Sequence, residues 1–188
     1  MRYVVTGANG YLGRYVFNEL RARGLEAKGL GHKPMKGIEF CDLTDSRMTC
    51  DIINKLGPST IIHCAARVPK SGIEYEDRFA ADSSIEMAYN IANNACGHVI
   101  FASSMAVYDN KINCYSKPVN ESEVNSLPRS AYAEGKWRAE KIFSEKVSRG
   151  AISLRLPGLF GLPRRGGLLY NAAHAILETG EFDLTSST

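Results

Sequence analysis

The fold is decided by the stretch Val4-Val5-Thr6-Gly7-Ala8-Asn9-Gly10-Tyr11-Leu12-Gly13, in which three evenly spaced glycines join an apolar run to a helical pattern. Glycine has no Cβ, so backbone N–H groups in such a turn approach a ligand closely, and the partly positive N-terminus of the next helix attracts anions. A strand, a glycine turn and a helix in this order predict a phosphate site. A tight turn without a ligand is the alternative, because the order Gly7-x-x-Gly10-x-x-Gly13 departs from the usual dinucleotide pattern G-x-G-x-x-G.

Strand and helix patterns alternate along the rest of the chain. About 28 residues separate the strand near residue 100 from the helix that starts near Ala131, and a loop of that length is usually functional. The alternation predicts an α/β fold, a Rossmann-like doubly wound parallel sheet with helices on both faces and ligands at the carboxyl ends of its strands. Strands are expected over residues 2–6, 26–30, 60–64, 97–102 and 151–156, helices over 11–24, 46–56, 75–95, 131–147 and 168–178, and residues 38–43 are mixed in character.

Charge and cysteine content argue against several classes of partner. The chain has 188 residues, 44% of them hydrophobic, which suits a globular domain with a substantial core. A net charge of +3 without a basic cluster argues against nucleic acid, and no apolar run approaches the ~20 residues that a membrane span needs. A small molecule is therefore the expected partner. The cysteines lack the paired spacings of a zinc site, so no metal is expected, and they predict reduced thiols in a cytoplasmic protein: Cys41, Cys50, Cys64, Cys96 and Cys114.

Two downstream stretches carry groups suited to proton transfer. Tyr132 and Lys136 stand four residues apart at the start of a predicted helix, so they share a helix face, and a nearby ammonium lowers the pKa of a phenol from about 10. An amphipathic helix with a snorkelling lysine is the alternative. Ser103 and Ser104 follow the predicted strand over residues 97–102, where this fold places ligands, although serines after strands also form turns.

Together, the glycine turn, the serines and the pair Tyr132-x-x-x-Lys136 resemble the extended short-chain dehydrogenase/reductase family, specifically its NAD-dependent epimerase/dehydratase branch that acts on nucleotide sugars. The resemblance implies that Tyr132 is the acid and base, that Lys136 holds the nicotinamide ribose and lowers the tyrosine pKa, and that Ser104 hydrogen-bonds the reacting oxygen. Ser104 is preferred to Ser103 because the family residue stands three positions before a valine, here Val107. The other matching stretches are Cys41-Asp42-Leu43, His63-Cys64-Ala65-Ala66, residues 103–108, Glu140 and residues 155–161.

The resemblance also implies a nicotinamide dinucleotide as cofactor. An acidic residue at the end of the second strand would bind the ribose 2′-hydroxyl of NAD, whereas a basic residue there accommodates the 2′-phosphate of NADP. The chain carries His32 and Lys33 at this position, which favours NADP, and a solvated surface Lys33 is the alternative. By the resemblance, the pyrophosphate lies against Gly7, Gly10, Tyr11 and Leu12, the adenine meets Asp42 and Leu43, and Ala65 and Ala66 lie along the cofactor.

Departures from the family pattern narrow the expected reaction. Family members that dehydrate sugars carry an Asp-Glu pair directly after the catalytic hydroxyl residue, whereas this chain has Met105 and Ala106, whose side chains move no proton. Epimerisation, reduction or oxidation at a sugar carbon remain. Arg164 and Arg165 are expected either to clamp the diphosphate of the substrate or to form an exposed basic loop. His63 is expected to be a structural histidine.

These observations predict an NAD(P)-dependent epimerase or reductase of a nucleotide sugar. The alternatives are a reductase of a non-sugar carbonyl and a non-catalytic NAD(P)-binding sensor or subunit. Residues 1–162 are expected to form the cofactor-binding domain and residues 163–188 to begin a small substrate-binding domain, in either a truncated piece or a naturally short member. The family implies a homodimer through the helices predicted over 75–95 and 131–147.

Overall fold

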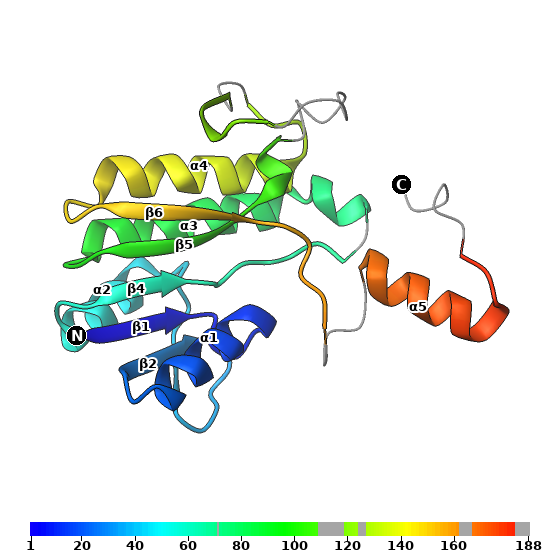
Figure 1. Cartoon of the computed structure of the whole chain (residues 1–188). Helices are drawn as coiled ribbons and strands as arrows, with labels where there is room; N and C mark the ends of the chain where they lie inside the picture. The colour runs from blue at the N-terminus through cyan, green and yellow to red at the C-terminus, as the bar shows by residue number, and fades with distance from the viewer. Residues whose placement is uncertain (71, 109–118, 124–126, 162–166, 183–188) are drawn as a thin grey trace.

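Six parallel strands form the sheet of this protein, in the order β3-β2-β1-β4-β5-β6 (Figure 1). The computed structural model describes residues 1–70, 72–108, 119–123, 127–161 and 167–182. The strand order reverses between β1 and β4, which is the doubly wound, Rossmann-like arrangement, and ligands bind such sheets at the carboxyl ends of the two strands flanking the reversal. The strands are β1 (Arg2–Thr6), β2 (Glu26–Gly31), β3 (Ile38–Phe40), β4 (Thr60–His63), β5 (Val99–Ser104) and β6 (Ala151–Leu156).

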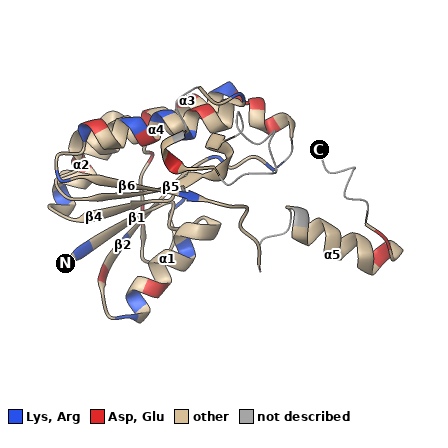
Figure 2. Ribbon diagram, turned by 45° about the horizontal axis from the view of Figure 1, so that its top comes forward, with Lys and Arg blue, Asp and Glu red and all other residues tan. Residues whose placement is uncertain are grey.

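Helices cover both faces of the sheet, as the alternation of patterns predicts. Figure 2 shows α1 on one face and α2, α3 and α4 on the other, while α5 lies apart from both layers. Three short 3₁₀ turns, η1 (Ile73–Glu76), η2 (Met105–Tyr108) and η3 (Glu121–Glu123), also belong to the described chain. The helices are α1 (Tyr11–Ala22), α2 (Ser46–Leu56), α3 (Arg78–Asn94), α4 (Ala131–Lys146) and α5 (Leu168–Thr179).

The core lies in two layers because consecutive strand residues point to opposite faces of the sheet. Val4 is buried in the layer beneath α2, α3 and α4, together with Phe101 and Phe143, whereas Val5 packs with Phe17 of α1 in the opposite layer. Full burial of side chains of this size stabilises a fold by about 1.5–3 kcal/mol each. The strands around β1 are therefore fixed from both faces, which holds their carboxyl ends in place.

Two local differences from the predicted elements have simple causes. Helix α3 begins at Arg78 rather than near residue 75, because the Asp77 carboxylate accepts a hydrogen bond of 3.1 Å from the N–H of Ala80 and caps the helix there. The mixed stretch 38–43 contains the short strand β3, whose pairing with β2 depends on a neighbour rather than on its own pattern. Helix α2 is capped by Asp45, since its carboxylate accepts from the N–H of Met48 at 2.9 Å.

Membrane and cysteine features can be stated for the described residues. None of the helices there is both long enough and apolar enough to cross a bilayer. The cysteines of this part of the chain are free: Cys41, Cys50, Cys64 and Cys96. The cytoplasmic location stays a prediction.

Candidate functional site

The glycine turn packs directly against the segment that follows β4. Gly7 has a φ of +66°, and a Cβ there would lie 2.7 Å from the backbone nitrogen of Ala65. A Cβ on Gly13 would lie 2.2 Å from the carbonyl oxygen of Gly7. Close backbone approach therefore requires both glycines whether or not a ligand binds, and their packing brings the start of α1 to the carboxyl ends of β1 and β4.

The N-terminus of α1 has the properties of an anion site. Gly10 occupies the N-cap position and supplies no side-chain hydrogen bond, so the first N–H groups of the helix are not capped by that residue. These groups and the helix dipole favour a phosphate. The turn thus fits the pyrophosphate of a dinucleotide, and Gly7, Gly10, Tyr11 and Leu12 are the residues that would surround it.

An open, largely apolar hollow lies beside this helix start. It has a volume of about 550 Å³ and is lined by Tyr11, Leu12, Tyr15, Leu159, Phe160 and Gly161. The Tyr11 hydroxyl donates toward the carbonyl oxygens of Phe160 and Gly161, at 2.8 and 3.1 Å, and so joins α1 to the segment that follows β6.

A buried polar contact joins the ends of β1 and β4. The Thr6 hydroxyl lies 2.7 Å from Nδ1 of His63 and accepts a hydrogen bond of 3.3 Å from the N–H of Ala65. Burial, helped by the charge of Lys136, lowers the pKa of His63 to about 3, so the imidazole is neutral at pH 7. His63 is thus the structural histidine that the sequence predicts.

The two serines at the end of β5 face different surroundings. The Ser103 hydroxyl is buried and donates a hydrogen bond of 2.5 Å to the Glu140 carboxylate of α4. Ser104 is partly exposed, and its hydroxyl accepts from the N–H of Ala106 at 3.1 Å. The two hydroxyls therefore have different partners, a carboxylate of α4 for Ser103 and a backbone N–H of η2 for Ser104.

Lys136 lies in a buried position next to the end of β5. Its ammonium donates a hydrogen bond of 2.8 Å to the carbonyl oxygen of Ala102 and lies 4.8 Å from the ring centre of Phe101. Burial lowers the pKa of Lys136 to about 8, although Cys64 and Glu140 act in the opposite direction. Such a lysine holds its positive charge at neutral pH only at an energetic cost.

Tyr132 and Lys136 share one face of α4, as their spacing predicts. The Lys136 ammonium lies 5.9 Å from the centre of the Tyr132 ring, and the Tyr132 ring meets Tyr75 edge-on at 5.5 Å. Because Lys136 contacts Ala102, two residues before Ser104, the fold brings the end of β5 and the first turns of α4 to one edge of the sheet. A phenol, an ammonium and a hydroxyl at one edge form a set able to move a proton to or from an oxygen.

The other predicted site residues are distributed around this edge. His32 and Lys33 are exposed just after β2, and the Lys33 carbonyl accepts from the Asn9 amide at 3.3 Å. The Asp42 carboxylate is exposed and accepts from both the N–H and the hydroxyl of Thr44. The Leu43 side chain lies in the core rather than in a cleft. Ala65 and Ala66 are partly exposed after β4, whereas Arg164 and Arg165 lie outside the described residues.

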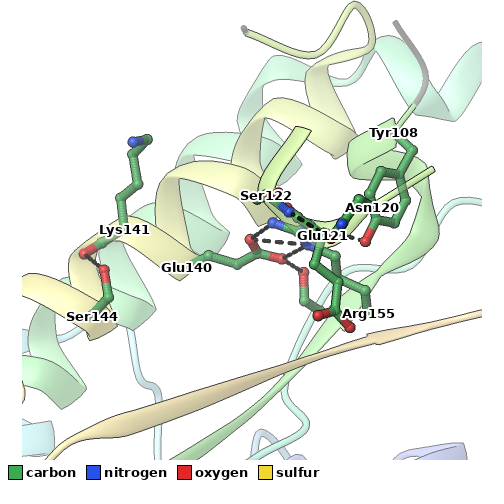
Figure 3. Close-up of polar contacts among 9 residues, drawn as sticks. Tyr108, Asn120, Glu121, Ser122, Glu140, Lys141, Ser144 and Arg155 are labelled. Carbon is green, nitrogen blue, oxygen red and sulfur yellow. Dashed lines mark hydrogen bonds and ion pairs between the residues drawn. The ribbon is translucent and has the colours of Figure 1, made fainter. Parts of the chain in front are cut away.

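Sequence reasoning assigned no role to a polar network that joins Ser103, Glu140 and Arg155. Figure 3 shows Glu140 and Arg155 pointing toward each other, with Tyr108 beside the guanidinium. One signal was available, because Glu140 follows Lys136 by four residues and so continues the same buried face of α4. Within the described parts of the chain, no cluster of three or more His, Cys, Asp or Glu side chains is placed to hold a metal ion.

Known proteins resemble this chain over most of its length. Residues 3–185 match the sequence profile of the NAD dependent epimerase/dehydratase family. Methionine adenosyltransferase 2 subunit beta of Xenopus tropicalis is 30% identical over 164 residues, which cover 85% of this chain and 47% of that protein. The same subunit of Pongo abelii is 31% identical, with the same coverage. The chain therefore spans about half the length of the curated relatives it matches.

Solved structures share the fold. The UDP-glucose 4-epimerase of Thermus thermophilus, in complex with NAD, aligns with a TM-score of 0.67 at 24% identity, over 82% of this chain and 54% of that chain. A partial-consensus L-threonine 3-dehydrogenase aligns with a TM-score of 0.75 at 19% identity, over 96% of this chain and 62% of that one. At these identities the likeness establishes the architecture.

Proposed function

This chain belongs to the NAD-dependent epimerase/dehydratase family, and we propose that it is an NAD(P)-dependent epimerase or reductase that acts on a nucleotide sugar. The observation that carries the proposal is the position of Lys136. Its buried ammonium lies on the Tyr132 face of α4 and contacts the strand that ends at Ser104. A buried lysine with a lowered pKa is costly to keep, and such costs are typical of functional sites.

Each of the three side chains has a task that its surroundings suit. Bound NAD(P) supplies the hydride acceptor and donor. The Tyr132 oxygen takes the proton from a substrate hydroxyl or returns it to a carbonyl, and the Lys136 charge favours the phenolate form. The Ser104 hydroxyl hydrogen-bonds the same substrate oxygen and holds it against the phenol.

The residues after Ser104 favour epimerisation or reduction over dehydration. Elimination of water needs its own acid and base, whereas Met105 and Ala106 carry no titratable group. A reductase of a non-sugar carbonyl would use the same three side chains. Only the identity of the substrate distinguishes this alternative from the enzyme that we propose.

For the cofactor we favour NADP. His32 and Lys33 are exposed at the end of β2, where a 2′-phosphate would lie, and no carboxylate stands at that position. The solved epimerase of Thermus thermophilus binds NAD, so this preference is a distinguishing property that we propose for the chain itself.

Domain division and assembly are further parts of the proposal. We assign residues 1–162 to cofactor binding and residues 163–188, with Arg164 and Arg165, to the beginning of a substrate-binding region. Helix α5 lies apart from the helices flanking the sheet, in keeping with this division (Figure 1). A homodimer would use α3 and α4. These two helices pack closely within one chain, where a Cβ on Gly135 would lie 3.0 Å from Cα of Ala81.

A non-catalytic NAD(P)-binding subunit is the second candidate. It is favoured by the name of the curated relatives, which are beta subunits of methionine adenosyltransferase 2. Retention of Tyr132, Lys136 and Ser104 favours the enzyme, because a protein that merely binds the cofactor has no chemical need for them.

Replacement of Tyr132 by Phe separates the candidates. UDP-, GDP- and dTDP-sugars and simple ketones are screened by nicotinamide absorbance, and NADH and NADPH binding is followed by energy transfer from Trp137, the single tryptophan of the chain. Tyr132→Phe is expected to lower turnover by about 100-fold or more while cofactor affinity is retained. Tyr3→Phe, at the opposite end of β1, is the matched control. Unchanged turnover in Tyr132→Phe contradicts the enzyme proposal, and binding without turnover of any substrate by the parent chain favours the subunit.

A further inference from the structure

Arg155 of β6 connects four parts of the molecule. Its Nε and Nη2 nitrogens donate to the two carboxylate oxygens of Glu140, at 3.0 and 2.7 Å. Its Nη1 nitrogen donates to the hydroxyl of Tyr108 and to the backbone carbonyl of Glu121, both at 3.0 Å. Figure 3 shows these contacts meeting around one guanidinium. A single side chain thus joins β6, α4, η2 and η3.

The geometry of these contacts is specific to arginine. The guanidinium supplies a planar fork that matches a carboxylate, and it keeps further donors for Tyr108 and Glu121, whereas a lysine has three donors on one nitrogen. The guanidinium carbon also lies 4.9 Å from the centre of the Tyr108 ring. Hydrogen bonding to Glu140 raises the pKa of Arg155 further above its ordinary value, so the charge is permanent.

Stability alone is a poor reason for this arrangement. The Glu140 side chain is 10% exposed and that of Arg155 18%, so both charges lose most of their hydration. A buried ion pair often contributes no more stability than apolar residues of the same volume, because desolvation offsets the attraction. What the pair supplies is a fixed geometry.

That geometry bears on the three side chains of the proposed site. Glu140 stands one helical turn after Lys136, and it accepts from Ser103, the neighbour of Ser104, at 2.5 Å. Tyr108 ends the short turn η2, which begins directly after Ser104. Arg155 therefore contacts the segments on both sides of Ser104: the turn through Tyr108, and the strand end through Glu140, which accepts from Ser103. Glu140 also connects Arg155 to the helix that carries Tyr132.

We propose that Arg155 is a positioning residue, which holds Ser104 at a fixed place relative to Tyr132 and Lys136 through Glu140 and Tyr108. The effect of Arg155 on turnover rests on the proposed function. Its effect on the structure, which is to hold residues 104–108 in one conformation, does not depend on that function.

The test compares Arg155→Lys with the intact chain. The substitution keeps the charge opposite Glu140 but loses the fork and the contacts to Tyr108 and Glu121. Tyr108→Phe is a second, milder variant that removes one of these contacts and keeps the ring. The control is Arg149→Lys, at an exposed arginine in the turn before β6. Each variant is measured by thermal unfolding, NADPH affinity, amide hydrogen exchange and steady-state turnover.

Selective changes are expected for Arg155→Lys. Hydrogen exchange should accelerate in residues 104–108 and 121–123 and stay unchanged in α1 and β2, and NADPH affinity should be retained. Turnover should fall by about 10- to 100-fold with KM little changed, because a displacement of ~1 Å at a reacting group costs up to that much. Tyr108→Phe should show the same pattern with a smaller amplitude.

Two results overturn the inference. One is an unchanged exchange pattern in residues 104–108 for both variants. The other is a uniform acceleration of exchange across the chain, which indicates a general stabilising role. Failure of the proposed function is distinguishable, since a parent chain that binds NADPH but turns over no substrate leaves the exchange comparison to decide on Arg155.

Discussion

The ammonium of Lys136 and the carbonyl oxygen of Ala102 lie 2.8 Å apart, in a hydrogen bond that joins helix α4 to the end of strand β5. Lys136 is 4% exposed, so this contact is made almost without water. The contact places a positive charge, which burial disfavours, at the edge of the sheet where Ser104 and Tyr132 also lie. The same contact provides the first of four predictions that can be checked on the purified chain.

Lys136→Met is expected to stabilise the protein at neutral pH. The pKa of Lys136 is about 8 in the fold against 10.5 for an ordinary lysine, so at pH 7 the fold carries a charge that burial penalises. We expect a gain of about 1–3 kcal/mol in the free energy of unfolding at pH 7. Between the two pKa values the unfolded chain binds more protons, so the stability of the parent rises with pH and the gain shrinks by pH 10. Urea unfolding at both pH values measures the difference.

The matched control for this prediction is Lys141→Met, on the exposed side of the same helix. It should change the free energy of unfolding little at either pH. A Lys136→Met variant that is less stable than the parent at pH 7 would show that the Ala102 hydrogen bond outweighs the cost of burial.

His63→Gln is expected to reduce the acid sensitivity of the fold. The pKa of His63 is lowered from 6.5 to about 3, so below pH 6.5 this imidazole binds a proton in the unfolded chain but stays neutral in the folded chain. Stability is lost as the pH falls from 6.5 to 3, and between pH 6 and pH 4 the parent should lose about 1 kcal/mol per pH unit more than the variant. Glutamine retains a polar partner for Thr6. Exposed His98, replaced by Gln, is the control, and parallel pH curves for parent and His63→Gln would contradict the prediction.

Gly13→Ala is expected to destabilise the chain by about 2–3 kcal/mol, because the new methyl group meets the carbonyl of Gly7 at 2.2 Å and the turn must shift. NADPH affinity should fall as well, since the turn forms the proposed pyrophosphate site. Thermal unfolding and Trp137 energy transfer report the two effects. At Gly72 a Cβ meets nothing within 4 Å, so Gly72→Ala should leave both quantities nearly unchanged. Equal behaviour of the two variants would refute the packing argument.

Lys33→Glu is expected to shift the preference for NADPH over NADH. A carboxylate at the end of β2 repels a 2′-phosphate and accepts from a 2′-hydroxyl. The ratio of the two dissociation constants should change by about tenfold in favour of NADH, which corresponds to about 1.4 kcal/mol. Lys28→Glu makes the same charge change on the exposed side of β2 and serves as control. If both variants give the same ratio, Lys33 is a solvated surface residue.

Local patterns predicted most of the fold. Alternating apolar runs and helical periodicity located β1, α1, α2 and α4 within a few residues, since each of these elements is specified by its own neighbours in sequence. The start of α3 was misplaced because the cap at Asp77 competes with a continued helical pattern over residues 73–76. The stretch 38–43 stayed mixed in character at the level of sequence, because β3 has only three residues and is stabilised by its pairing with β2.

For the site, the sequence by itself determined which chemical groups are available: a glycine turn, two adjacent serines, and a tyrosine and a lysine on one helix face. It determined them because spacing along a strand or helix sets the face on which a side chain lies. The tertiary structure decided which groups meet. Thr6 reaches His63 across 57 residues, and Ser103 reaches Glu140 across 37. Such contacts depend on strand order and helix packing, which involve distant parts of the chain. Only the tertiary structure therefore reveals the burial that lowers the pKa of Lys136 and the hydrogen bonds that connect Arg155 to its neighbours.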